Sequence, residues 1–171
     1  LRLAAELPAG EYRSHLQFKA IPQNPPEGAP RQADGASNGV SVRLKATFGV
    51  SIPVIVRHGR TSASATMTDL VLTRNAAPDQ PLILSAVINR EGNQSLYGDL
   101  VATFSTGKGR PVTVATVGGV AVYTPNARRI VRLELKPPTG TEIANGRITL
   151  SYREKPTDGG KLIAEASVDV D

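Results

Sequence analysis

The sequence predicts an all-β protein, and three observations lead to this prediction. Between Val40 and Val56 every second residue is apolar, which is the period of a long β-strand with one wet face. From residue 62 onward, short β-like stretches alternate with turn sequences. The apolar residues are mainly Val, Ala, Leu and Ile, with 4% aromatic residues and no Trp, a composition that favours packed sheets.

The first part of the chain, residues 1–60, supplies only about two strands, too few to enclose a core. A strand is predicted over 11–21, after the turn-like sequence Leu-Pro-Ala-Gly. A long loop rich in Pro and Gly is predicted over 22–39. The long strand over 40–57 follows and ends at a hinge. We therefore expect either that the first strands of this domain lie outside the sequence or that another chain completes it.

The second part, residues 61–171, is predicted to form an immunoglobulin-like β-sandwich. Seven or eight short strands separated by turns over about 110 residues are typical of an antiparallel sandwich of this type. No helix of more than one or two turns is expected, and 106–109 is predicted to be a hairpin turn. The strands are predicted over 62–73, 82–89, 98–105, 111–117, 120–123, 129–135, 146–153 and 162–170.

The charge of the chain is basic, with a formal net charge of +5 and a pI near 9.8. The basic residues occur mostly singly along predicted strands, which indicates a solvated surface rather than a nucleic-acid site. Stacking on nucleic acid would require interleaved aromatic residues, and Tyr123 near Arg128 and Arg129 is a thin version of that pattern. No apolar run is long enough to insert into a membrane.

Catalytic and metal-binding patterns are absent from the sequence. With no Cys, disulfides, Cys-zinc sites and thiol catalysis are excluded. His15 and His58 lack acidic neighbours at metal-ligand spacing, so no metal and no cofactor are expected. No Ser lies in a nucleophile elbow, and Asn93-Gln94-Ser95 matches the glycosylation acceptor pattern, a match common by chance. We expect a binding protein rather than an enzyme. Two roles are open for the long strand: an internal strand of its own domain, which the pattern alone favours, or a strand added to a partner.

Three segments in order resemble the periplasmic chaperones of pilus assembly, the chaperone–usher family. They are LPAGEYRSHLQFKAIP (7–22), VRLKATFGVSIPVIVRHG (42–59) and TDGG (157–160), and the resemblance covers nearly the whole chain. Members of that family have two immunoglobulin-like domains. The resemblance implies that residues 1–60 are the last strands of the first domain, with 11–21 as its sixth strand and 40–57 as its seventh. It also implies a periplasmic location, with any signal peptide removed or outside this sequence.

The resemblance implies a function and a set of site residues. In that family the seventh strand is donated to an incomplete pilus subunit, which the chaperone stabilises before assembly, and an outer-membrane usher is a further partner. The family also has a charge bridge between its domains, and a Lys on the seventh strand that anchors the subunit's carboxylate. That Lys position holds Pro53 here, which predicts an altered client. By position, the donor residues are Val42, Leu44, Ala46 and Phe48, and the bridge residues are Glu11, Arg57 and Asp158.

Two other functions remain open from the sequence. The first is a structural or adhesive immunoglobulin-like module of the pilus that accepts a strand, which an open groove in the sandwich of residues 62–171 would favour. The second is a basic module that binds polyanions, whose affinity would fall steeply with salt. Self-association through exposed strand edges is also expected.

Overall fold

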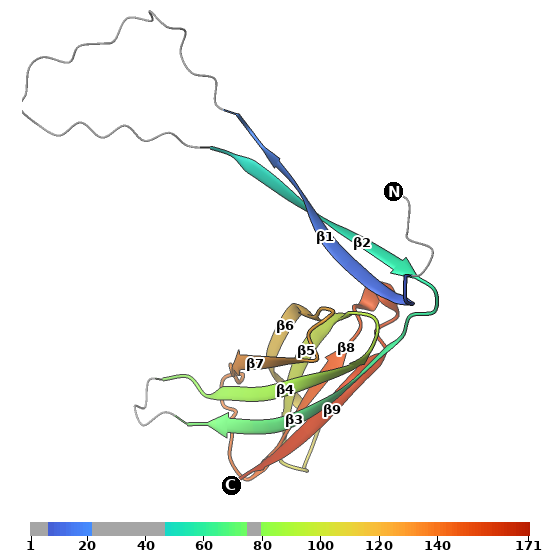
Figure 1. Ribbon diagram of the computed structural model, residues 1–171. Coiled ribbons are helices and arrows are strands. Elements are labelled where there is room, and N and C mark those ends of the chain that lie inside the picture. The colour runs from blue at the N-terminus through green and yellow to red at the C-terminus, as the bar shows by residue number, and fades with distance from the viewer. Residues whose placement is uncertain (1–6, 22–46, 75–79) are drawn as a thin grey trace, which may run out of the picture. The chain divides into compact units, whose positions relative to one another are not determined.

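The computed structural model describes residues 7–21, 47–74 and 80–171 of the chain (Figure 1). Nine strands form three sheets in these residues, and the predicted all-β sandwich is confirmed. By its internal contacts the chain divides into two units, one of residues 13–55 and one of the remaining residues. This division assigns the beginning of the first strand and the end of the second to the unit that contains the sandwich, whereas the sequence predicts a boundary at residue 60. That residues 1–60 end a first immunoglobulin-like domain stays a prediction.

The first two strands pair with each other in a sheet of two strands, which we call the ribbon. Strand β1 covers Gly10–Lys19 and strand β2 covers Gly49–His58. The predicted strand over 40–57 is therefore observed from Gly49 onward, and its residues 40–46 lie outside the described residues. Two strands alone bury little apolar surface, so the ribbon depends on further contacts for its stability.

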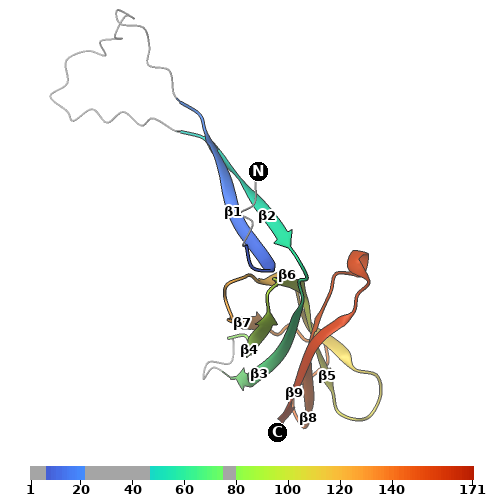
Figure 2. The same cartoon turned by 45° about the vertical axis from the view of Figure 1, so that its right-hand side comes forward.

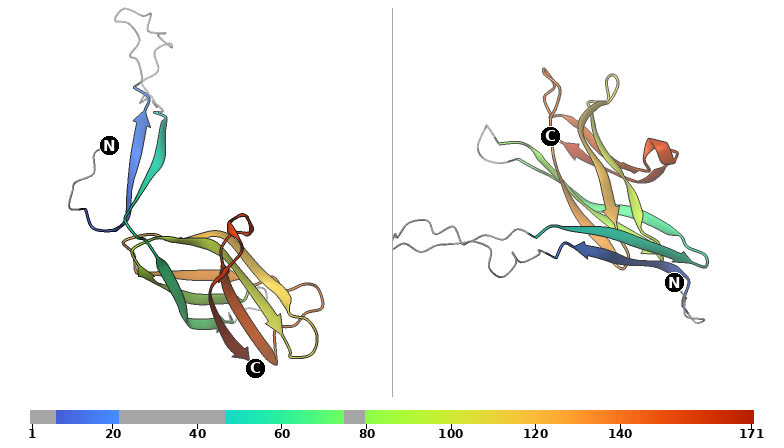
Figure 3. Two further views of the ribbon diagram at one scale, coloured as in Figure 1. Left: turned by 90° about the vertical axis from the view of Figure 1, so that its right-hand side faces the viewer. Right: turned by 90° about the horizontal axis from the view of Figure 1, so that it is seen from above.

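Seven strands form the sandwich, in two antiparallel sheets that face each other as layers (Figure 2, Figure 3). The first sheet has the order β3-β4-β7 and the second the order β6-β5-β8-β9. A single turn of 3₁₀ helix, η1 (Pro156–Asp158), connects the last two strands. The strands are β3 (Ala63–Thr73), β4 (Ile83–Gly92), β5 (Leu96–Ser105), β6 (Val112–Val122), β7 (Arg128–Glu134), β8 (Gly146–Arg153) and β9 (Leu162–Val170).

The core lies between the two sheets and is made of alternate residues of each central strand. Leu84 and Ile88 of β4 face Leu100 of β5 and Leu150 of β8 across this space, and all four are fully buried. Because successive side chains of a strand point to opposite faces, strict alternation in the sequence placed these residues inward. Tyr152 is also fully buried and donates its hydroxyl to the carbonyl of Val120 at 2.8 Å.

One strand differs from its prediction. The sequence predicts a break between strands over 111–117 and 120–123, but β6 continues through both as one strand. Its register shifts at Gly118 and Gly119, and Gly119 has a φ of +71° that L side chains rarely adopt. The Gly119 N–H donates to Oδ1 of Asp99 at 2.9 Å, which supports the irregular position. The two glycines therefore form a bulge within a strand rather than the end of one.

The other turn and helix predictions hold in the described part of the chain. The hairpin turn over 106–109 connects β5 to β6, with Gly107 and Gly109 at φ values of +79° and +94°. Among the described residues, no helix has the length and apolar character needed to cross a membrane.

Candidate functional site

The register of the ribbon is fixed by contacts at its two ends. The N–H of Ala20 donates to the carbonyl of Phe48 at 2.8 Å, which makes these residues a hydrogen-bonded pair. At the other end, Nε of Arg57 lies 3.2 Å from Oε2 of Glu11. Glu11 and Ala20 are nine residues apart, as are Phe48 and Arg57, so the pairing needs no bulge between them. In this register Phe18 lies opposite Val50.

One face of the ribbon is apolar and exposed. Residues with even numbers share a face, because side chains alternate along each strand and the paired residues have the same parity. Phe48 is 78% exposed and Val50 62% exposed, and three further apolar residues of this face are about half exposed. We call this surface the apolar face; its members are Leu16, Phe18, Phe48, Val50 and Ile52.

The opposite face of the ribbon carries positive charge. Its odd-numbered positions include the basic residues Arg13 and Lys19 on β1. Ile55 of β2 is the large exposed apolar side chain on this face. The two faces of the ribbon therefore differ in chemistry as the sequence alternation predicts.

Of the four predicted donor residues, the structure describes one. Phe48 belongs to the apolar face and is its most exposed member. Val42, Leu44 and Ala46 lie outside the described residues. Their role as donors stays a prediction.

Pro53 lies within β2 without interrupting its pairing to β1. Because the even-numbered pairs exchange the ladder hydrogen bonds, the N–H and C=O groups of odd-numbered residues point away from the partner strand. The N–H that Pro53 lacks would therefore lie on the outer edge of β2, where proline is tolerated. Pro53 therefore removes an outer-edge donor but no ladder bond.

At the base of the ribbon, the carboxylate of Glu11 is enclosed by polar partners. Its side chain is fully buried, whereas that of Arg57 is 54% exposed. Besides the ion pair with Arg57, the carboxylate accepts a hydrogen bond from Oγ of Ser95. Its backbone carbonyl accepts the hydroxyl of Thr124 at 3.4 Å. A buried carboxylate with these partners fixes geometry, since desolvation offsets much of the attraction between the charges.

The third predicted bridge residue, Asp158, is not brought into this ion pair. It lies exposed in η1, where its N–H donates to the carbonyl of Lys155 at 2.8 Å. Within the described residues, no ion pair or hydrogen bond joins Asp158 to Arg57 or Glu11. Glu11 and Arg57 both belong to the unit that contains the sandwich. Their role as a bridge between domains stays a prediction.

Asn93 connects the base of the ribbon to the turn between β4 and β5. Its Oδ1 accepts the N–H of Ser62 at 2.9 Å, and its Nδ2 donates to the carbonyls of Ala9 at 2.9 Å and Arg60 at 3.1 Å. Its backbone N–H donates to Ser62 at 3.0 Å, and its carbonyl accepts the N–H of Glu11 at 2.9 Å. We call Glu11, Arg57, Asn93 and Ser95 the root cluster.

Sequence reasoning missed the root cluster's Asn93 and Ser95. Both belong to the tripeptide that matches the glycosylation pattern, and the structure uses their side chains internally. The sequence does contain one signal for this position, because the pair Gly92-Asn93 is typical of a turn. The structure places a turn there, with Gly92 at a φ of +95°.

Arg90 is a buried cation that holds this turn in shape. It is 8% exposed and donates Nε to Asn126 at 2.9 Å, and Nη1 to the carbonyls of Gly92 at 2.7 Å and Gln94 at 3.0 Å. These bonds fix the backbone on both sides of Asn93. A signal existed in the sequence, because Arg90 continues the inward-facing alternation of β4.

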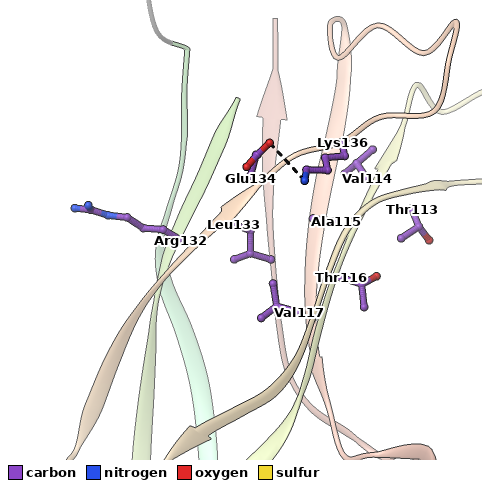
Figure 4. Close-up of a pocket in the computed structure, with 9 residues that line it drawn as sticks. All are labelled: Thr113, Val114, Ala115, Thr116, Val117, Arg132, Leu133, Glu134 and Lys136. Carbon is purple, nitrogen blue, oxygen red and sulfur yellow. Dashed lines mark ion pairs between the residues drawn. The ribbon is translucent and has the colours of Figure 1, made fainter. Parts of the chain in front are cut away.

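A shallow groove of about 420 Å³ lies between the edge strands β6 and β7 (Figure 4). Val114 and Leu133 line it and are each 1% exposed, so the core beneath the groove is closed. The N–H of Lys136 donates to Val114 at 2.6 Å, and its Nζ lies 3.7 Å from Oε1 of Glu134. Arg132 extends to the other side of β7, away from β6 (Figure 4). The groove therefore does not resemble a site from which a core strand is missing.

No metal-binding cluster is found in the described part of the chain. No three His, Asp or Glu side chains gather there closely enough to hold an ion. The same residues contain no buried side-chain polar atom without a hydrogen-bond partner.

Comparisons with known proteins do not name a family. No family model matches the chain, and no curated protein matches it. Among solved structures, the chain is similar to DesR, a β-glucosidase from Streptomyces venezuelae in complex with D-glucose, with a TM-score of 0.40 and 14% identity over 67% of this chain. The chain spans 16% of the length of that protein. No function follows from so distant a similarity.

Proposed function

We propose that this chain is a periplasmic chaperone-like protein that binds pilus subunits by donating a β-strand. The observation that carries the proposal is the apolar face of the ribbon, where Phe48, directly before β2, is 78% exposed and the even-numbered residues of β2 from Val50 to Val56 are apolar. An exposed face of this kind is a hazard to a protein unless a partner covers it. A subunit that lacks a strand is such a partner, because it has an apolar groove and an unpaired backbone edge.

The position of Pro53 supports a division of β2 into two parts. Backbone groups on the outer edge of β2 belong to odd-numbered residues and are free to pair with a client up to Gly49 and Ser51. Pro53 ends that edge because it has no N–H to donate. The donated stretch therefore lies before Pro53, in the part of the strand that holds the predicted donors Val42, Leu44, Ala46 and Phe48.

The part of β2 after Pro53 serves as an anchor in this proposal. Arg57 is held by the buried carboxylate of Glu11, and the neighbouring backbone is held by Asn93. A donor strand needs a fixed end, because a strand free at both ends would lose more conformational entropy on binding. The root cluster provides that fixed end.

In the chaperone–usher family a Lys on the seventh strand anchors the subunit's carboxylate, and the client that we propose for this protein is held by no such anchor. Pro53 stands where the related chaperones carry the anchoring Lys. We therefore propose a client whose affinity comes from the alternating apolar side chains and the strand backbone rather than from a carboxylate lock.

The strand-accepting alternative has less support. The sandwich has seven strands in the described residues, and buried Val114 and Leu133 close the core beneath the groove between β6 and β7. Two hydrogen bonds connect the β7 side of the groove to β6. The N–H of Lys136 donates to the carbonyl of Val114, and Nη1 of Arg129 donates to the carbonyl of Ala121 at 2.7 Å. A strand acceptor would instead expose its core along a continuous open edge.

The test is co-expression with a candidate pilus subunit followed by affinity purification. Phe48→Glu places a charge on the apolar face and should reduce recovery of the subunit at least tenfold, since a buried unpaired charge is costly. Leu44→Glu should act in the same way. Ile55→Glu is the matched control, because Ile55 is 46% exposed on the opposite face of the ribbon. Equal recovery with Phe48→Glu and with the parent would refute the proposal.

A further inference from the structure

We infer that a second copy of this chain covers the apolar face, in a dimer in which two ribbons pack face to face about a two-fold axis. The inference uses only the geometry of the ribbon and goes beyond the proposed function, because it names a partner that requires no pilus subunit. Leu16, Phe18 and Ile52 are each about half exposed on this face, and Phe48 and Val50 are more exposed. Two strands cannot bury such a face by themselves.

The size of the apolar face matches a weak dimer. From their exposed fractions, the five side chains present roughly 500 Å² per copy, given that a large aromatic side chain buries about 150–250 Å². Two copies would then bury about 1,000 Å², which is near the lower limit for a specific interface. We expect a dissociation constant on the order of 10 μM, in the range of transient complexes.

The distribution of charge selects this face for self-association. A two-fold axis places a surface patch against the same patch of the partner. On the even-numbered side, residues 12–20 and 48–56 carry no charged side chain, so the patch meets itself without repulsion. The opposite side carries the charged side chains of Arg13 and Lys19, which an interface there would have to remove from water.

Packing by faces is also favoured over pairing by edges. The outer edge of β2 is interrupted at Pro53, which has no N–H to donate to a partner strand. A two-fold pairing of two β1 edges centred on Leu16 would bring Arg13 of one copy opposite Lys19 of the other. Two stacked sheets about 10 Å apart, in contrast, bury alternating apolar side chains and leave both edges unchanged.

The experiment is sedimentation velocity of the protein purified from its complete reading frame, between roughly 1 and 200 μM, which brackets the expected dissociation constant. The parent should pass from monomer to dimer over this range. Val50→Glu should raise the dissociation constant at least 30-fold, and Ile55→Glu, on the opposite face, should leave it unchanged. Hydroxyl-radical footprinting of the parent provides a second readout that needs no variant, because oxidation of Phe18 and Phe48 should fall as the concentration rises.

Each other outcome overturns the inference. A parent that stays monomeric at 200 μM with Phe18 and Phe48 oxidised has an uncovered face. A monomer with both residues protected at every concentration has this face covered by its own polypeptide. A dimer that is insensitive to Val50→Glu uses a different surface. Because no pilus subunit is present, these results are independent of the test of the proposed function.

Discussion

Replacing Asn93 by Ala removes the side chain that joins the base of the ribbon to the sandwich. The change deletes three hydrogen bonds, to the N–H of Ser62 and to the carbonyls of Ala9 and Arg60, at 2.9, 2.9 and 3.1 Å. It leaves the two backbone hydrogen bonds of Asn93 in place, including the one from the N–H of Glu11. The variant therefore separates the side chain's contribution from that of the turn.

The magnitude follows from the number of bonds and their exposure. A net hydrogen bond contributes about 0.5–1.5 kcal/mol, so three bonds contribute about 1.5–4.5 kcal/mol. All three are exposed to solvent, and water replaces part of each, which places the expected loss near 2 kcal/mol. That loss corresponds to about a 30-fold increase in the population of locally open states.

Hydrogen exchange of individual amides, followed by NMR, measures this opening. The Ser62 amide should exchange faster because it loses its acceptor directly. The Glu11 amide keeps its acceptor, so its exchange should accelerate about 30-fold only if the base of the ribbon opens as a unit. Gln94→Ala is the control, since the Gln94 contact at this turn is made by its backbone carbonyl. If Glu11 exchange in Asn93→Ala stays within threefold of the parent, Asn93 does not anchor the ribbon.

Three further variants test the packing and electrostatics of the unit that contains the sandwich. Burial raises the pKa of Tyr152 from 10.0 to about 12, so the unfolded state ionises first and the free energy of unfolding should fall by about 2 kcal/mol as pH rises from 10 to 12. Tyr152→Phe should remove this fall in urea titrations. Leu84→Ala, at a fully buried site, should lower the free energy of unfolding by about 2–5 kcal/mol in the same assay, and a loss below 1 kcal/mol would contradict the assigned core. Glu11→Gln should cost less than about 1 kcal/mol in thermal denaturation, because Arg57 is 54% exposed, and the difference from the parent should shrink at high salt.

The strands of the sandwich were largely predictable because their pattern is local. The observed bounds of β8 and β9 coincide with the predicted ranges 146–153 and 162–170. The failure at Gly118 and Gly119 has a specific cause, since a pair of glycines ends a strand or forms a bulge depending on what lies beside it. Here Asp99 of the neighbouring strand accepts the Gly119 N–H, and no local pattern reveals that contact.

The candidate site divides in the same way. The apolar face follows from alternation within one strand, and the exposure of Phe48 and Val50 is consistent with it. The root cluster joins Glu11 to residues more than 80 positions away in the sequence, Asn93 and Ser95. Hydrogen bonds over such separations leave no periodic trace in one sequence. The pairing of Glu11 with Arg57 was expected from the family resemblance, but the same resemblance grouped Asp158 with them, which the described contacts do not.

The unbroken register of the ribbon limits how its sequence can change in length. Deleting Ser51 alone would keep Arg57 opposite Glu11 but turn Phe48 and Val50 toward the face of Arg13, because one residue reverses the direction of every side chain before it. Deleting two adjacent residues would restore the original orientation. Related sequences should therefore gain or lose residues in β2 in pairs, or balance each single change by one at the paired position of β1. Turns of the sandwich should gain or lose odd and even numbers of residues alike.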